Sequence, residues 1–250
     1  MCTVMDDKLK VLCVSDEEYL PYLYSLLNSL DRNTSCIESV IIYLVNVPRS
    51  ITFRKYKFEL ELNFEEVDCD KTKNKLTRYS CGTLNGRYMS HHHAYCNNLR
   101  YLVIPDILKA IDVPLVYIDV DNIVRKDLVE FSKEIRQYDV SIFKYPLHLH
   151  PVSWRKFMTF ACGIIGISPT QNSIDFFEDM KNEVINNKIL TVGDQLDFYN
   201  VWLKHKDKIK LNKFSKSYKD CDFHDDSVIW SGDGNVKDVK KFKMEMDSYK

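Results

Sequence analysis

The sequence predicts an α/β protein, a single domain built on an open, mostly parallel β-sheet with helices on both faces. Short apolar runs that suit buried strands alternate along the chain with longer segments that repeat apolar residues at helical spacing. One such run, PLVYIDV (114–120), is continuously apolar up to its first aspartate, as expected for a strand buried on both faces of a parallel sheet. Ligands of such sheets bind at the carboxyl ends of the strands.

The chain is expected to open as strand, helix, strand. Residues 10–15 and 39–46 are short apolar runs, and the segment between them carries apolar residues at helical spacing. Asp16 directly precedes this helix and is expected to cap it. Glu17 and Glu18 then suit the positive end of the helix dipole.

The middle of the chain is more polar. Residues 52–70 are expected to form a peripheral helix or strand that leads into an exposed strand. The polar segment 71–89 contains two glycines and is expected to be a mobile loop. Residues 90–111 are predicted to be helical, with Pro105 starting a second helical segment.

The second half continues the alternation. Residues 139–146 and 160–170 are predicted strands, and 172–188 and 193–206 are predicted helices. The last 40 or so residues are charged and are expected to be irregular, apart from the apolar stretch within 226–234.

The composition excludes several classes of protein. With 35 Lys and Arg against 36 Asp and Glu, the net charge of −1 argues against nucleic acid as a partner. The longest apolar runs, such as 40–47, are too short for a transmembrane segment. Eight scattered cysteines lack common zinc spacings and are expected to be reduced and mostly buried. Without a signal-peptide pattern, we expect a cytoplasmic protein, and attachment to a membrane surface stays open.

Two carboxylates, Asp119 and Asp121, follow the predicted buried strand. On an extended strand their side chains would point the same way and repel each other, so a cation is expected nearby. Paired oxygen ligands suit Mg²⁺ or Mn²⁺, which keeps coordination positions for phosphates. The alternative is a strand-ending turn whose acids cap the next helix or face water, and a D-x-D alone does not decide between the two.

The segment VYIDVDNIVRKDLVEF resembles the D-x-D motif of glycosyltransferases with the GT-A fold. More narrowly, it resembles the glycogenin-like family, glycosyltransferase family 8, which includes bacterial lipopolysaccharide galactosyltransferases and glucosyltransferases. Further blocks resemble this family in the same order: VSDEEYLPYLYSLLNSL, LRYLVIPDIL, FACGIIGIS, GDQLDFYN and SGDGNVK. The resemblance implies a GT-A fold with a nucleotide-binding half over about 10–130 and an acceptor and donor-sugar half over about 131–240.

The resemblance also implies an activity. The chain would be a metal-dependent glycosyltransferase that moves a hexose from a nucleotide-diphosphate sugar, expected to be UDP-linked, to a hydroxyl acceptor with retention of configuration. The acceptor would be a glycan, a lipid-linked sugar or a protein. The cofactor would be Mn²⁺ or Mg²⁺, with Asp119, Asp121 and the position of Ser231 as metal ligands.

The remaining site residues follow from the same resemblance. Asp16 and Tyr19 would hold the nucleotide, and Arg100 would pair with a phosphate or with carboxylates that bind the sugar. Gly234 and Lys237 would lie at the diphosphate, while Asp194 and Gln195 would be catalytic, orienting the sugar hydroxyls or the attacking group. Each has a structural alternative: helix capping or core packing for Asp16 and Tyr19, a surface arginine for Arg100, and a solvated lysine for Lys237.

The sequence departs from the family pattern at several positions. Ser231 stands where the family has a metal-binding histidine. A hydroxyl is a weak ligand, so either the metal affinity is lower or Asp233, or a nearby residue such as His224, takes that place. Ala161 replaces the asparagine of the family's Asn-Ala-Gly strand, which leaves the donor sugar open. Asp238 and Val239 replace the Pro-Trp pair that follows the lysine in the family's closing motif.

Two further segments, 91–93 and 148–154, lie outside these motifs. Three consecutive histidines at 91–93 cannot all face one ion on a helix, so we expect a surface feature from which one residue contributes to the acceptor cleft. The aromatic segment 148–154 is either an ordinary packed loop or a platform for an acceptor sugar.

Two other functions are possible. A nucleotidyltransferase would need a glycine-rich basic loop after the first strand, whereas the segment found there, SDEEYLPY, is acidic and has no glycine. A non-catalytic sugar-nucleotide or glycan-binding module stays open.

Overall fold

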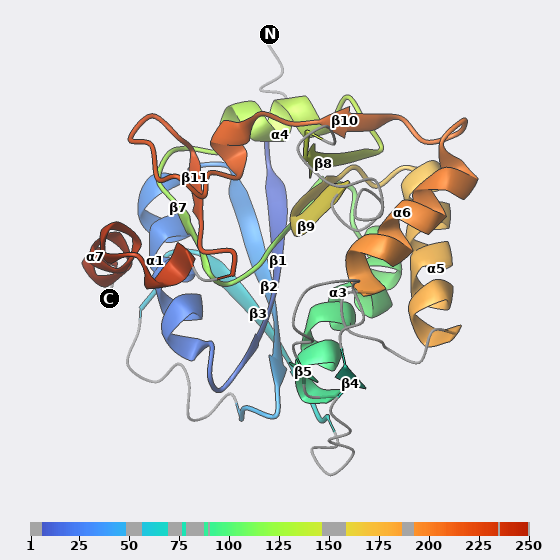
Figure 1. The fold of residues 1–250 in the computed structure, drawn as a ribbon. Coiled ribbons are helices and arrows are strands. Elements are labelled where there is room, and N and C mark those ends of the chain that lie inside the picture. The colour runs from blue at the N-terminus through green and yellow to red at the C-terminus, as the bar shows by residue number, and fades with distance from the viewer. Residues whose placement is uncertain are drawn as a thin grey trace, which may run out of the picture.

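The computed structural model describes residues 7–48, 57–69, 77–78, 88–89, 91–146, 159–186, 193–234 and 236–249. At its centre lies a seven-stranded sheet in the order β10–β8–β9–β6–β1–β2–β3 (Figure 1). The strands are β1 (Leu9–Asp16), β2 (Ile37–Val45), β3 (Glu61–Val67), β6 (Leu115–Ile118), β8 (Val140–Lys144), β9 (Phe160–Ile167) and β10 (Leu211–Lys213).

Only one of these seven strands runs against the others. β1 pairs in parallel with β2 and β6, β2 with β3, and β8 with β10. β9 is antiparallel to both of its neighbours, β6 and β8. The prediction of an open, mostly parallel α/β sheet is therefore confirmed.

Helices cover both faces of the sheet (Figure 1). Successive side chains of a strand point to opposite faces, so β1 sends Leu9, Val11 and Cys13 into one core, and Leu12 and Val14 into the other. The first core includes α1 (Leu20–Asn33) and α4 (Val129–Ile135). The second includes α3 (His91–Ala110), α5 (Gln171–Asn186) and α6 (Gly193–His205).

The first strand–helix junction differs from the prediction. Asp16 is the last residue of β1, and α1 begins at Leu20 with Tyr19 as its N-cap residue, so the predicted cap is wrong. Pro21 suits the first helical turn because it lacks an N–H that would be unpaired there anyway. Glu17 and Glu18 precede the helix instead of lying in its first turn. Asp16 Oδ1 still accepts a hydrogen bond from the Tyr19 N–H, at 3.1 Å, and so stabilises the turn.

The middle of the chain is described in part. β3 is the exposed strand predicted within 52–70, and it lies at the edge of the sheet. Most of the proposed mobile loop at 71–89 lies outside the described residues. Within that loop, β4 (Thr77–Arg78) and β5 (Tyr88–Met89) form a short antiparallel pair. Pro105 lies inside a continuous α3, so the second helical segment was wrong. Buried side chains on both sides of the proline, such as Tyr101 and Leu108, hold the helix to the sheet and offset the lost hydrogen bond.

The C-terminal region is more regular than predicted. Besides β10 and β11 (Ile229–Ser231) it contains two 3₁₀ turns, η4 (Lys216–Tyr218) and η5 (Val236–Asp238), and the helix α7 (Lys240–Ser248). β11 pairs antiparallel with β7 (Asn122–Val124). Phe242 and Met246, one helical turn apart, pack α7 into a third cluster with Trp230. This packing places the C-terminal region beside the end of β6.

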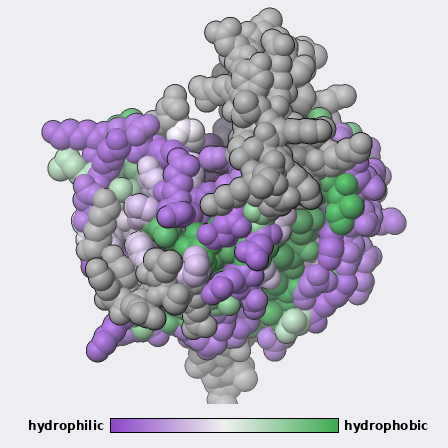
Figure 2. Space-filling model, turned by 90° about the horizontal axis from the view of Figure 1, so that it is seen from below, coloured by the Kyte–Doolittle hydropathy of each residue, from purple (hydrophilic) through white to green (hydrophobic). Residues whose placement is uncertain are grey.

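Three further observations complete the fold. The six described cysteines are free thiols, and four of them are buried, as expected. Seen from below, at the end of the molecule toward which β1 and β2 run, the described surface is largely hydrophilic, with hydrophobic side chains showing mainly at its centre and on one flank (Figure 2). None of the described helices combines the length and the apolar character that crossing a membrane requires.

Candidate active site

A cavity of about 520 Å³ lies at the carboxyl end of β6, where the β6–β7 turn meets α3, β9, α6 and the C-terminal region. Its volume is within the range typical of small-molecule sites. Nine of the ten predicted site residues line it: Tyr19, Arg100, Asp119, Asp121, Asp194, Gln195, Ser231, Gly234 and Lys237. The tenth, Asp16, lines a smaller adjoining pocket at the end of β1, which shares Tyr19, Asp119 and Asp121 with the larger cavity.

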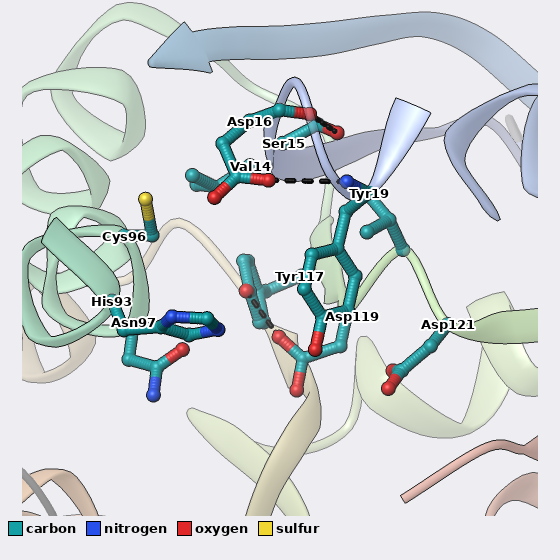
Figure 3. Close-up of a pocket in the computed structure, with 11 residues that line it drawn as sticks. Val14, Ser15, Asp16, Tyr19, His93, Cys96, Asn97, Tyr117, Asp119 and Asp121 are labelled. Atoms are coloured by element: carbon teal, nitrogen blue, oxygen red, sulfur yellow. Dashed lines mark hydrogen bonds between the residues drawn. The ribbon is translucent and has the colours of Figure 1, made fainter. Parts of the chain in front are cut away.

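Asp119 and Asp121 lie in a turn, not on an extended strand as predicted, because β6 ends at Ile118. The Asp119 N–H donates to the Gly163 carbonyl at 2.8 Å, and the Asn122 side chain donates to the Asp119 carbonyl at 2.6 Å. Both carboxylates nevertheless point into the same space, next to the Tyr19 hydroxyl (Figure 3). A Cβ at Gly163 would lie 2.8 Å from Asp119 Oδ2, so a larger residue here would force the Asp119 carboxylate to shift.

Protein cations accompany the two carboxylates. Arg100 donates to Asp119 Oδ1 at 3.0 Å, the Tyr117 hydroxyl donates to the same oxygen, and Lys237 Nζ lies 3.4 Å from Asp121 Oδ2. Burial raises the pKa of Asp119 to about 6; the charge of Arg100 opposes this shift and that of Asp121 adds to it. Burial likewise raises the pKa of Asp121, against the opposing effect of Lys237. The carboxylates are thus held in a setting that favours a further positive charge.

Arg100 links the D-x-D to α6. Its side chain is 3% exposed and donates to Asp194 as well as to Asp119. Its guanidinium lies over the rings of Tyr117, at 4.7 Å, and Tyr101, at 4.9 Å. The prediction gave Arg100 either a phosphate or carboxylates as partners. Among the described residues, its partners are the carboxylates of Asp119 and Asp194. Asp194 lies in the first turn of α6, where the helix dipole favours a carboxylate.

The end of β1 is connected to the C-terminal region. Lys237 Nζ donates to the Tyr19 hydroxyl at 2.8 Å and lies 4.5 Å from the centre of the Tyr19 ring. Asp16 Oδ2 lies 2.9 Å from His92 Nε2. His92 thus contacts Asp16, whereas the neighbouring His93 lines both pockets, so these two consecutive histidines have different surroundings.

The position of the family's metal-binding histidine is built differently here. Ser231 Oγ accepts a hydrogen bond from Lys219 Nζ at 3.3 Å, and Lys219 also donates to Asp233 Oδ2 at 3.0 Å. Of the two suggested substitutes, Asp233 lines the cavity, whereas His224 pairs with Asp220 at 3.1 Å. Lys219 was not predicted as a site residue, because it lies in a lysine-rich polar segment whose sequence gives no sign of its burial.

The residues present suit a hard divalent cation. Asp119, Asp121 and Asp233 offer carboxylate oxygens, the ligands that Mg²⁺ and Mn²⁺ prefer. Within the described part of the chain, neither Asp119 Oδ2 nor Asp121 Oδ1 has a hydrogen-bond partner. Both oxygens would thus be available to hold a divalent ion, which when bound would supply positive charge to a diphosphate.

Two other groups of side chains reach metal-ligand spacing in the described residues. The first consists of Asp16, His92 and Cys96, and the second of Asp220, Asp222 and His224. Burial raises the pKa of the Cys96 thiol, which disfavours the thiolate that a metal would need. In the second group the carboxylate of Asp220 is taken up by hydrogen bonds from its own loop, so protein contacts account for both groups.

The remaining predicted positions are placed as follows. Gly234 lines the cavity with a φ of 62°, a left-handed conformation that favours glycine. Ala161, which replaces the family's asparagine, lines the cavity too. Asp238 ends η5 and Val239 is the N-cap residue of α7. The aromatic segment 148–154 lies outside the described residues. Asn97, one turn before Arg100 on α3, also lines the cavity and was not singled out from the sequence.

Replacing Asp220 with asparagine is expected to lower the free energy of unfolding by about 2 kcal/mol at pH 7, the scale of hydrogen bonds to a charged group. Asp220 is fully buried and accepts from the Ser227 hydroxyl at 2.7 Å and from the N–H groups of Asp222 and His224. Burial alone would raise the pKa of Asp220, but these hydrogen bonds hold it below its ordinary value. Its contribution is therefore present above the unfolded-state pKa of about 3.9 and lost as the pH falls through the lower folded-state value.

Urea denaturation of the parent and of Asp220→Asn at pH 7 and pH 3 measures this difference. The matched control is Asp222→Asn, which removes an exposed carboxylate of the same loop and should change little. A difference between parent and Asp220→Asn that grows on acidification would contradict the assignment.

Comparisons with known proteins support the fold. Neither a protein-family model nor a curated protein sequence matches this chain. Three solved structures align with it over most of its length. The galactosyltransferase LgtC, in complex with donor and acceptor sugar analogues, has a TM-score of 0.61 at 13% identity, over 96% of this chain and 95% of LgtC. Mouse xyloside xylosyltransferase 1 has a TM-score of 0.59 at 14% identity, over 92% of this chain and 99% of that one.

The third structure is the glycosyltransferase GlyE of Streptococcus pneumoniae TIGR4, with a TM-score of 0.61 at 16% identity over 97% of this chain. This chain spans 60% of the length of GlyE. At these identities the likeness establishes the fold, which is the GT-A fold of these glycosyltransferases, in agreement with the resemblance of the sequence motifs.

Proposed function

We propose that this protein is a glycosyltransferase that moves a hexose from a nucleotide-diphosphate sugar, UDP-linked and held with Mn²⁺ or Mg²⁺, to a hydroxyl acceptor with retention of configuration. The acceptor would be a glycan, a lipid-linked sugar or a protein. The observation that carries the proposal is the convergence of Asp119 and Asp121 with Lys237 on one cavity at the carboxyl end of the parallel strands.

Different residues of the cavity would bind different parts of the donor. The pocket with Asp16 and Tyr19 would take the base, where a tyrosine ring offers stacking and a carboxylate accepts from an N–H group. Asp119 and Asp121 would hold the divalent ion, which when bound neutralises charge on the diphosphate as it leaves. Lys237 would bind a phosphate oxygen from the C-terminal side, next to Gly234.

The sugar end of the cavity is held by α6. Arg100 fixes the carboxylate of Asp194 relative to that of Asp119, so that the sugar and diphosphate positions are set by one buried guanidinium. Asp194 and Gln195 would orient the sugar hydroxyls or the attacking group. An amide is a poor nucleophile, so positioning and stabilisation of positive charge are the roles proposed for this pair.

A thermal-shift screen of nucleotide sugars tests the proposal. A ligand present at 100 times its Kd adds about 2.7 kcal/mol to the stability of the native state. We expect UDP-hexoses with Mn²⁺ to raise the Tm more than the same donors with EDTA, and more than nucleotide sugars with other bases. If no nucleotide sugar raises the Tm under either condition, the proposal is wrong.

Hydrolysis of the best donor, followed by chromatography, separates the enzyme from the non-catalytic module. The weakened third ligand position at Ser231 is the feature that favours the module. Donor cleavage that depends on Mn²⁺ supports an enzyme, and binding without cleavage, across a range of sugar acceptors, supports a module.

A further inference from the structure

We propose that the Lys219 ammonium binds the donor diphosphate directly, together with Lys237, so that the chain itself supplies part of the positive charge that a divalent ion would provide. This inference rests on the proposed function, because it assigns a further ligand of the same diphosphate.

The burial of Lys219 is the first observation. Its side chain is 2% exposed, although lysines are almost never fully buried unless paired. The carboxylate nearest to it, on Asp233, is 54% exposed, so much of that partner's charge is screened by solvent. A buried cation with a solvated partner on a cavity wall suits a site that receives further negative charge.

The hydrogen bonding of Lys219 is the second observation. An ammonium group carries three donors. Among the described residues, two of them are used, by Ser231 Oγ at 3.3 Å and Asp233 Oδ2 at 3.0 Å, both of which line the cavity. Lys219 lines the same cavity, so its third donor is available to an oxygen of a bound molecule.

The backbone fixes the ammonium relative to the D-x-D. Residues 219–220 run beside β11, with the Asp220 N–H bonded to the Ile229 carbonyl at 3.1 Å and the Ser231 N–H bonded to the Asp220 carbonyl at 2.8 Å. β11 pairs with β7, and the Gly232 N–H donates to the Asp121 carbonyl at 2.7 Å. Lys219, Ser231 and Asp121 therefore lie on three adjacent, hydrogen-bonded segments.

The charge of the cavity gives the third observation. Its lining contains three cations, Arg100, Lys219 and Lys237, and four carboxylates, on Asp119, Asp121, Asp194 and Asp233, which is a formal charge of −1. Arg100 is engaged by two of these carboxylates. Lys219 and Lys237 are thus the cations available to a diphosphate, and the charges of both act on Asp121.

The location of Lys219 also bears on the metal. Its ammonium donates to the hydroxyl at the third ligand position, where a divalent ion would meet a like charge. We therefore expect UDP to bind this protein measurably without a metal. Without Lys219, binding should become dependent on the metal.

Calorimetric titration of UDP and UMP, each with Mn²⁺ and with EDTA, tests this on the parent protein and on Lys219→Met. In EDTA we expect the parent to bind UDP more tightly than UMP, and Lys219→Met to bind UDP about ten- to a hundredfold more weakly than the parent, the scale of one charged hydrogen bond. With Mn²⁺ the loss should be several-fold smaller. Lys219→Arg keeps the charge and should retain binding in EDTA.

The matched control is Lys216→Met, which removes an exposed lysine three residues earlier and should leave both affinities unchanged. Equal losses with Mn²⁺ and with EDTA in Lys219→Met would show a structural role and overturn the inference, as would parent-like binding. The parent alone also decides: if UDP binds with Mn²⁺ but not with EDTA, or if UMP matches UDP in EDTA, Lys219 does not bind the diphosphate. If the parent binds no nucleotide under either condition, the proposed function itself fails.

Discussion

Replacing Asp121 with asparagine is expected to lower donor cleavage and sugar transfer by at least about a hundredfold, the scale on which removing one preorganised electrostatic group acts. The amide has nearly the same size as the carboxylate, so the turn between β6 and β7 should keep its backbone hydrogen bonds. What is lost is the charge that holds a divalent ion and that faces Lys237 at 3.4 Å. Chromatographic assay of UDP-hexose cleavage with Mn²⁺, at saturating donor, measures the loss.

Asp112→Asn is the control for this substitution. It makes the same chemical change at an exposed residue before the start of β6, at the opposite end of the strand from the D-x-D. It should leave the rate within a factor of about two, since exposed substitutions rarely exceed 0.5 kcal/mol. Cleavage by Asp121→Asn at close to the parental rate would remove Asp121 from the site.

Replacing Arg100 with methionine is expected to lower the free energy of unfolding by about 3 kcal/mol. The substitution leaves the carboxylates of Asp119 and Asp194 without their shared partner. It also replaces the guanidinium that lies over the rings of Tyr101 and Tyr117 with a flexible, uncharged side chain. Breaking a buried ion pair on one side costs more than the pair itself contributes, because uncompensated charge is left behind. Urea denaturation at pH 7 gives the difference.

Two further variants show whether the loss comes from the unpaired carboxylates. Arg136→Met removes an exposed arginine and should change stability by less than about 0.5 kcal/mol. In the triple variant Arg100→Met, Asp119→Asn, Asp194→Asn, the total loss should be smaller than the sum of the separate losses, because no unpaired charge remains. Additive losses would mean that Arg100 stabilises the fold through packing alone.

The central sheet was predictable because its strands are local, continuous apolar runs. β1, β2, β6, β8 and β9 each bury most of their residues, so the sequence alone marks them. Short elements such as β7 and β10 have three residues each and no periodicity to detect. α7 was missed because Phe242 and Met246 are its two buried residues in a strongly charged segment.

The candidate site was predictable wherever a motif places a residue at the end of a strand or the start of a helix. Asp119, Asp121 and Asp194 are of this kind, and each lines the cavity. Lys219 could not be found in this way, since its burial depends on contacts with Ser231 and Asp233, twelve and fourteen residues further along the chain. The predicted cap at Asp16 failed because α1 begins at Leu20, with Tyr19 as its N-cap residue and Pro21 in its first turn.

The pairing of β7 with β11 joins parts of the chain about a hundred residues apart. A nascent chain that has left the ribosome only as far as β10 already exposes the D-x-D, yet neither lysine of the cavity has emerged. Donor binding of the kind proposed here would therefore require the segments after β10 to dock against β7. Long-range pairing of this type slows folding, so the interval between synthesis and competence is set by topology rather than by the strength of any single contact.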